Sequence, residues 1–151
     1  MSSLKEKNRR ILVVDDEADV LEFLKIYLET MGWDVTAAPT VSRAFEELEK
    51  QPHFLVITDI AMPEMDGYEF INAIKMQGFE CQFALMTGFG YNPKHTLVKI
   101  YKTVKYPCLF KPFNREKVTE AVNGAYALYH HDIDNIDGTA ADADGNSDNN
   151  D

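Results

Sequence analysis

The sequence predicts an α/β protein with a doubly wound, five-stranded parallel sheet and helices on both of its faces. Segments of strand type and segments of helix type alternate five times along the chain. Parallel strands need a crossover connection, and helices supply it. Three of the strand segments are continuous apolar runs, as expected for strands that are covered on both faces. A chain of 151 residues that is 45% hydrophobic can also bury one sizeable core.

The first strand and the first helix fall within the first 32 residues. Residues 10–14, RILVV, form a short apolar run that ends at Asp15 and Asp16. From Glu17 onward the apolar residues recur at spacings of three and four, which predicts a helix. Gly32 is suited to end that helix as its C-terminal cap.

Two further pairs of strand and helix follow. Residues 33–38, WDVTAA, and residues 53–59, HFLVITD, have the composition of strands. Residues 41–50, VSRAFEELEK, and residues 67–78, GYEFINAIKMQG, follow them as helices. The strand at 53–59 is fit for burial and yet ends on a carboxylate, that of Asp59, which calls for a chemical reason.

The last two pairs complete the alternation. Residues 81–88, CQFALMTG, and residues 106–111, YPCLFK, are the fourth and fifth strands. Residues 93–103 are expected to form a helix between them. Asn114 is placed to cap a last helix that runs to about Tyr129.

Charge divides the chain into a folded part and a tail. The formal net charge is −10, but residues 132–151 hold seven aspartates and no Lys or Arg, which leaves 18 acidic and 15 basic residues elsewhere. This segment has neither periodicity nor aromatic residues and cannot offset the entropy of ordering. We therefore expect a flexible N-terminus at 1–8, one domain at 9–131 and a disordered acidic tail at 132–151.

Composition also excludes several classes of function. No apolar run approaches the twenty or so residues that cross a bilayer, and the first residues lack the apolar region of a secretion signal, so we expect a cytoplasmic protein. No basic stripe is visible, which argues against direct binding of nucleic acid. Cys81 and Cys108 lie in apolar stretches without metal-type spacing, which favours reduced packing residues.

Polar residues stand where the predicted strands end, which is where doubly wound sheets collect functional groups. These residues are Asp15, Asp16, Asp59, Thr87 and Lys111. Two carboxylates about 4 Å apart repel by roughly 4 kcal/mol near a protein surface. Because Lys111 neutralises only one charge, the cluster needs a cation, and oxygen ligands with room for water suit Mg²⁺. Beside such a metal, a carboxylate can act as a nucleophile toward a phosphoryl group.

Four motifs, ILVVDDE, ITDIAMPEMDGYEF, ALMTG and LFKPF, resemble in order and spacing the receiver domain of two-component response regulators. The resemblance spans roughly residues 9–130 and implies a flavodoxin-like (βα)5 fold. It implies a signalling switch rather than an enzyme, in which Asp59 accepts a phosphoryl group from a histidine kinase or a phosphotransfer protein. This would explain the carboxylate at the end of a buried strand.

The resemblance also implies a set of Mg²⁺ ligands. Asp15 and Asp16 match the acidic pair that holds the metal, with Asp16 the more direct ligand. Asp59 and the main-chain carbonyl of Ala61 complete the protein ligands. Thr87 matches the hydroxyl that turns toward the phosphoryl oxygens.

Other matched positions concern the switch itself. Lys111 matches the lysine that pairs with the phosphoryl oxygens, and Pro112 matches a proline that usually follows a cis bond. Receivers commonly carry an aromatic switch residue three positions before that lysine, where this chain has Cys108. Tyr106, two residues earlier, points to the same face of a regular strand, so we expect it to take over part of that role.

The lifetime of the phosphorylated form depends in this family on the residues two beyond the acceptor and two beyond the hydroxyl. These residues are Ala61 and Phe89, and neither can orient a hydrolytic water. We therefore predict slow self-dephosphorylation, with Phe89 also shielding the acyl phosphate from solvent.

The expected output is regulated binding of an unknown downstream protein, because no DNA-binding or enzymatic domain follows. The expected docking face consists of helix 93–103, strand 106–111 and the last helix, and a phosphorylation-dependent homodimer is left open. One alternative is a pseudo-receiver scaffold that keeps the fold and ignores phosphate. Two weaker ones are a flavin-binding α/β protein, disfavoured by carboxylates after strand 10–14, and an aspartate-nucleophile phosphatase, disfavoured by Ala61 where a second aspartate is usual.

Overall fold

The computed structural model describes residues 7–88 and 106–148, the last of these, 132–148, as main chain only. Five strands and four helices lie in these ranges. They are β2 (Arg10–Val14), α1 (Ala18–Thr30), β3 (Asp34–Ala38), α2 (Val41–Lys50), β4 (Leu55–Asp59), α3 (Gly67–Met76), β5 (Gln82–Thr87), β6 (Cys108–Phe110) and α5 (Arg115–Asp148). The helix predicted at 93–103 lies outside the described residues.

The strands form one sheet in the order β3-β2-β4-β5-β6, and every neighbouring pair is parallel. The predicted five-stranded parallel sheet is therefore confirmed. The order of strands reverses between β2 and β4, because β3 lies on one side of β2 and the later strands lie on the other. In open α/β sheets, ligands bind outside the carboxyl ends of the strands at such a reversal.

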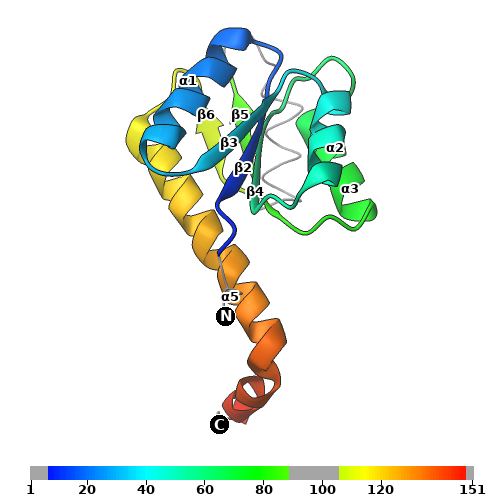
Figure 1. The fold of residues 1–151 in the computed structure, drawn as a ribbon, viewed down its shortest axis with the longest axis vertical. Coiled ribbons are helices and arrows are strands. Elements are labelled where there is room, and N and C mark those ends of the chain that lie inside the picture. The colour runs from blue at the N-terminus through cyan, green and yellow to red at the C-terminus, as the bar shows by residue number, and fades with distance from the viewer. Residues whose placement is uncertain (1–6, 89–105, 149–151) are drawn as a thin grey trace.

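Helices cover both faces of the sheet, with α1 and α5 on one face and α2 and α3 on the other (Figure 1). Successive residues of β2 serve opposite faces, as the twofold period of a strand requires. Ile11 and Val13 pack in the cluster with α1 and α5, whereas Leu12 and Val14 pack in the cluster with α2 and α3. The continuous apolar runs in the sequence follow from this double covering.

Side-chain caps fix where three of the helices begin. The Thr40 hydroxyl accepts a hydrogen bond from the Arg43 amide at the start of α2. Asp66 and Glu69 form a reciprocal capping box at the start of α3. The Asn114 side chain accepts from the Lys117 amide ahead of α5, as the sequence predicts. The α3 cap matters for function, because the loop before it connects to the end of β4.

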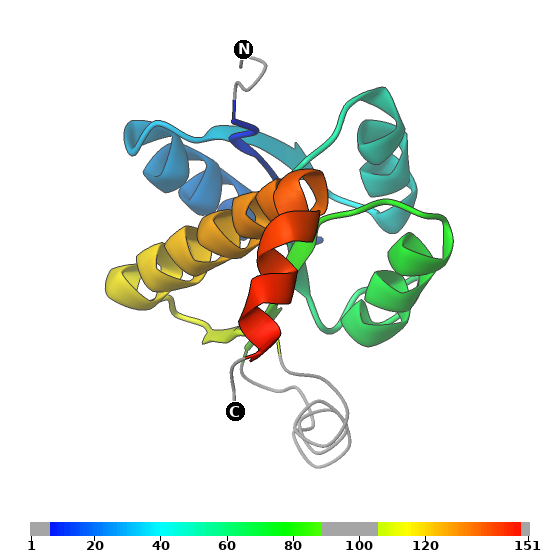
Figure 2. The same ribbon diagram turned by 90° about the horizontal axis from the view of Figure 1, so that it is seen from below.

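Helix α5 differs from the prediction. The sequence places its end near Tyr129 and disorder from residue 132, but the helix continues to Asp148. Its first turns cover the sheet, and its last turns project away from the body in a changed direction (Figures 1 and 2). The prediction of disorder rested only on the inability of residues 132–151 to bury apolar surface. A helix that is already nucleated can be extended without such burial, since extension needs only one further bond per residue.

Within residues 7–88 and 106–148, no helix combines the length and the apolar character needed to cross a membrane.

Candidate functional site

The carboxyl ends of four strands bring the predicted site residues to one edge of the sheet. Asp15 follows β2, Asp59 ends β4, Thr87 ends β5 and Lys111 follows β6. Pairing beyond the strands keeps the edge in register, since the Lys111 amide donates to the Thr87 carbonyl at 2.8 Å. The parallel sheet thus gathers residues from four separate parts of the sequence.

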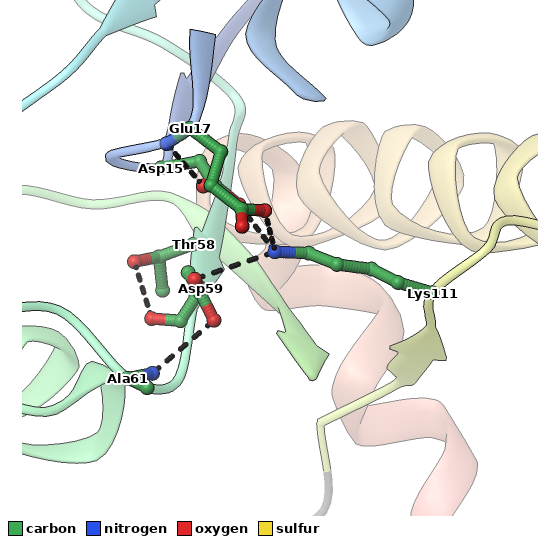
Figure 3. A network of polar contacts seen from close by, with 6 residues as sticks. All are labelled: Asp15, Glu17, Thr58, Asp59, Ala61 and Lys111. Carbon is green, nitrogen blue, oxygen red and sulfur yellow. Dashed lines mark hydrogen bonds and ion pairs between the residues drawn. The ribbon is translucent and has the colours of Figure 1, made fainter. Parts of the chain in front are cut away.

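The Lys111 ammonium is the hub of this site (Figure 3). Its Nζ lies 2.8 Å from Asp15 Oδ2, 3.3 Å from Glu17 Oε1 and 3.4 Å from Asp59 Oδ2. Burial alone would lower the pKa of Lys111, but its hydrogen bond to Asp15 and the charges of Asp59 and Asp15 outweigh burial and raise that pKa. Lys111 is therefore a fixed positive charge.

The two adjacent aspartates after β2 differ in their surroundings. Asp15 is 0% exposed, and both of its oxygens accept hydrogen bonds, Oδ1 from the Glu17 amide and Oδ2 from Lys111. Asp16 is exposed and lines the cleft above the edge of the sheet. This arrangement leaves the Asp16 carboxylate more accessible to an added ligand than that of Asp15.

Asp59 is 7% exposed and is held from two sides. Its Oδ1 accepts a hydrogen bond from the Ala61 amide at 3.2 Å, and its main-chain oxygen accepts from the Thr58 hydroxyl at 3.1 Å (Figure 3). Burial, and then the negative charge of Asp15, raise the pKa of Asp59, while the Ala61 amide and Lys111 act in the opposite direction. The Asp59 carboxylate is therefore destabilised even with Lys111 beside it, and a further positive group would stabilise it.

The loop after Asp59 depends on a glycine. The Gly67 amide donates to the Ile60 carbonyl at 2.7 Å. A Cβ at Gly67 would lie 2.8 Å from the Asp59 main-chain oxygen and 3.0 Å from the Ile60 Cα. Only a residue without a side chain allows α3 to start this close to the end of β4.

The acidic residues fit a hard divalent cation. Asp15, Asp16 and Asp59 each offer a carboxylate oxygen, and these oxygens lie within 4.8 Å of one another. One ammonium, that of Lys111, stands against these three carboxylates. The excess negative charge and the all-oxygen ligand set suit Mg²⁺. Ala61 lines the same cleft, so its carbonyl belongs to the same surroundings.

The cleft has a volume of about 880 Å³ and combines an acidic side with an apolar side. Phe23 from α1 and Phe113 line its apolar side, with their rings stacked at 6.0 Å. Glu17 lines its acidic side. Phe23, Phe113 and Glu17 were not among the site residues predicted from the sequence, although Glu17 directly follows the aspartate pair and Phe113 directly follows Lys111-Pro112.

Of the residues predicted to tune the switch, Tyr106 and Cys108 lie in the part of the chain that the structure describes. Tyr106 and Cys108 pack against the same cluster, the one on the α2 and α3 side, as residues two apart near a strand should. The Tyr106 ring lies 5.5 Å from that of Phe83, and Lys75 Nζ lies 5.2 Å from its centre. Phe89 lies outside the described residues.

Pro112 and the two cysteines also lie among the described residues. Pro112 follows a cis peptide bond and lines the cleft. Cys81 and Cys108 form no disulfide, and burial raises the pKa of both thiols, that of Cys81 to about 12. Both cysteines are therefore packing residues, as their apolar context predicts.

Known proteins match this chain over most of its length. A family model described as the response regulator receiver domain matches residues 11–123. The response regulator receiver protein CpdR of Brucella abortus is 34% identical over 116 residues, which are 74% of this chain and 92% of CpdR. The response regulator protein PilR of Pseudomonas aeruginosa is 30% identical over 80% of this chain but only 26% of PilR.

A solved structure agrees with these matches. The crystal structure of a response regulator receiver domain protein from Clostridium thermocellum has a TM-score of 0.68 and 26% identity, and the match covers 79% of this chain and 94% of that chain. The present chain spans 50% and 26% of the first two curated relatives that it matches. With five parallel strands, a gathered acidic edge and the family match over residues 11–123, this chain belongs to the response regulator receiver domain family.

Proposed function

We propose that Asp59 accepts a phosphoryl group from the phosphohistidine of a histidine kinase or phosphotransfer protein, and that this modification switches the binding of a downstream protein. One observation carries the proposal. The nearly buried Asp59 faces the Lys111 ammonium at 3.4 Å, at the edge of the sheet where the order of strands reverses. This arrangement supplies a nucleophile and a positive charge for the incoming phosphoryl oxygens.

In the transfer, an Asp59 carboxylate oxygen forms a bond to phosphorus, and the bond between phosphorus and the histidine nitrogen breaks. The electron pair stays on that nitrogen, which takes a proton from solvent. The Ala61 amide holds Asp59 Oδ1 in place, and Lys111 pairs with a phosphoryl oxygen. Thr87, at the end of β5, would supply a hydroxyl donor. Catalysis here is mainly positioning and charge.

The metal in this account is Mg²⁺, which neutralises charge on the phosphoryl oxygens when it is bound. Asp16, Asp59 and the main-chain carbonyl of Ala61 would be its direct protein ligands. Asp15 would be a less direct ligand of the metal, because its two oxygens already accept hydrogen bonds from the Glu17 amide and the Lys111 ammonium.

The functional unit in this proposal is residues 9–131, acting in the cytoplasm. The upstream donor would approach the cleft beside α1. The downstream protein, or a second copy after phosphorylation, would bind a face that includes β6 and α5. The match to 92% of CpdR, a response regulator receiver protein, supports placing the function in the receiver domain itself.

The phosphate-independent scaffold is the less favoured candidate. Asp15 and Asp59 are both nearly buried, and their mutual repulsion contributes to the raised pKa of Asp59. A scaffold has no use for such a destabilising pair, whereas a phosphoacceptor needs it. The receiver family acts generally in signalling, which also disfavours a separate enzymatic activity.

Intact-mass spectrometry tests the proposal. The chain is incubated with acetyl phosphate and Mg²⁺, and we expect a gain of one phosphoryl group that Asp59→Asn abolishes. Chelation of Mg²⁺ should prevent the gain, and Asp16→Asn should strongly reduce it. An unmodified wild type, or equal modification of Asp59→Asn, would refute the proposal and favour the scaffold.

A further inference from the structure

Glu17 is a fourth carboxylate at the site, beside the three that are candidate metal ligands. Its Oε1 lies 3.3 Å from Lys111 Nζ although its side chain is 62% exposed. Glu17 is the N-cap residue of α1, but its side chain makes no capping hydrogen bond. Figure 3 shows the side chain reaching from the start of α1 to Lys111 instead.

The contact matters because an ammonium has only three N–H donors. Asp15 Oδ2, Glu17 Oε1 and Asp59 Oδ2 are three acceptors within 3.4 Å of Lys111 Nζ. A phosphoryl group on Asp59 introduces further oxygen acceptors close to the same ammonium. For Lys111 to bind one of them, an existing acceptor has to be released.

The geometry indicates which acceptor is released. Asp15 is fully buried and makes the shortest contact, 2.8 Å, so losing Lys111 would leave its charge unpaired out of water. Glu17 is exposed, makes a longer contact, and can be rehydrated when it turns away. Asp59 itself carries the new group. Glu17 is therefore the partner that Lys111 gives up most readily.

We propose that Glu17 is a positioning residue that holds the Lys111 ammonium in the unphosphorylated protein and competes with the phosphoryl group for it. An interaction that is present before the reaction and lost in the transition state slows the reaction. Glu17 thereby sets how readily Asp59 is phosphorylated. This inference rests on the proposed function, because it concerns the same reaction at Asp59.

The simpler alternative is that Glu17 only adds negative charge near an anionic phosphodonor. Asp19 provides the control for that effect, since it lines the same cleft and none of the described ion pairs of Lys111 involves it. Asp19→Asn removes one charge without affecting the contact. Glu17→Asp keeps the charge but shortens the side chain by one methylene, so it breaks the contact alone.

The experiment measures the rate at which acetyl phosphate with Mg²⁺ labels Asp59 in the full chain. We expect Glu17→Gln to raise the rate about two- to fivefold, the range for losing one exposed ion pair, and to exceed the effect of Asp19→Asn. Glu17→Asp should also be faster than wild type. The inference is overturned if Glu17→Asp matches wild type, if Glu17→Gln and Asp19→Asn change the rate equally, or if Glu17→Gln has no effect or slows labelling.

The NMR chemical shift of Lys111 Nζ gives a second readout, which a change in the overall stability of the protein does not affect. We expect Glu17→Gln to shift it in the unphosphorylated protein, and the shift to vanish after phosphorylation because the contact is then already released. A difference that persists after phosphorylation contradicts the competition. If wild type is not labelled at all, the proposed function falls and this inference with it, whereas normal labelling without a Glu17 effect overturns the inference alone.

Discussion

Lys111 Nζ lies 2.8 Å from Asp15 Oδ2, although the two residues are 96 positions apart in the sequence. Asp15 is 0% exposed, so this ion pair is what compensates its charge. Removing the cation should leave a buried carboxylate next to that of Asp59.

We therefore expect Lys111→Met to lower the free energy of unfolding by about 1–3 kcal/mol, less than for a fully buried pair because Lys111 is partly exposed. The double variant Lys111→Met with Asp15→Asn should recover most of the loss, since it removes the uncompensated charge as well. Urea unfolding at neutral pH without Mg²⁺ measures both. Equal stability of wild type and Lys111→Met would show that the pair contributes nothing.

Asp59 should make the folded state more stable in acid. Burial raises the pKa of Asp59 above its ordinary 3.8, so the folded state holds a proton that the unfolded state has already lost. The charged form therefore costs stability at neutral pH, and this cost is relieved as the pH falls through the raised pKa. We expect Asp59→Asn to stabilise the protein at pH 7 by about 1–2 kcal/mol, less than the roughly 4 kcal/mol between two carboxylates about 4 Å apart near a protein surface, because Lys111 offsets part of the repulsion.

Urea unfolding between pH 7 and pH 4 checks this expectation. The gain from Asp59→Asn should shrink toward the acid end of the range. A gain that is constant with pH, or a loss at pH 7, would contradict the assignment of a raised pKa.

His53 should have the opposite effect on acid stability. It is 1% exposed, neither ring nitrogen has a hydrogen-bond partner among the described residues, and burial followed by the charge of Arg10 lowers its pKa below 6.5. Below about pH 6.5, His53 takes up a proton in the unfolded state but stays neutral in the folded state. Stability should then fall by up to about 1.4 kcal/mol per pH unit until the lowered pKa is reached.

The variant His53→Leu tests this contribution, because it removes the titrating ring from the same apolar position. The difference in unfolding free energy between His53→Leu and wild type should grow as the pH falls from 7 to 5. A difference that does not vary over that range would mean that His53 titrates alike in both states.

Gly67 and Gly124 form a matched pair of glycine positions. A Cβ at Gly67 would meet main-chain atoms of Asp59 and Ile60 at 2.8 and 3.0 Å, whereas a Cβ at Gly124 in α5 meets nothing within 4 Å. Gly67→Ala should destabilise the protein by about 1–3 kcal/mol and slow phosphorylation by moving Asp59. Gly124→Ala should stabilise it by about 0.5–1 kcal/mol through helix propensity.

Thermal unfolding and labelling by acetyl phosphate compare the two alanine variants directly. If Gly67→Ala were as stable and as reactive as Gly124→Ala, the close approach of α3 to the end of β4 would contribute neither to stability nor to phosphorylation.

Tyr106 is expected to report phosphorylation to the rest of the domain. Its ring contacts Phe83 and Lys75, so Tyr106→Ala should cost about 1–2 kcal/mol of packing, and Tyr106→Phe much less. NMR of β6 and α5 amides, before and after adding beryllofluoride with Mg²⁺ as a phosphoryl analogue, measures the response. We expect Tyr106→Ala to reduce these shifts and Tyr106→Phe to keep them. A full response in Tyr106→Ala would remove Tyr106 from the switch.

The position of the site could be predicted from the sequence, because it depends only on where the parallel strands end. Asp15, Asp59 and Lys111 each stand at the end of an apolar strand, and parallel strands end at the same edge of a sheet. Knowing the strands was therefore enough to bring these residues together. The opposite faces served by Ile11 and Leu12 follow from the same twofold period.

Other features depend on packing that local sequence does not encode. The reach of Glu17 to Lys111 depends on where α1 starts relative to β6, and the burial of His53 depends on tertiary packing around the start of β4. The length of α5 was missed because its last turns face away from the core, where apolar periodicity carries no information. The positions of residues at strand ends therefore identified the central charged groups of the site, but not the partners that adjust them.

Chemical trapping of the acceptor identifies the residue that carries the phosphoryl group. After incubation with acetyl phosphate and Mg²⁺, borohydride reduces an aspartyl phosphate to homoserine, which peptide mass spectrometry locates in the chain. We expect homoserine at position 59 and at no other aspartate, including the seven in residues 132–151. Homoserine elsewhere, or none in a protein that carries phosphate, would contradict this expectation.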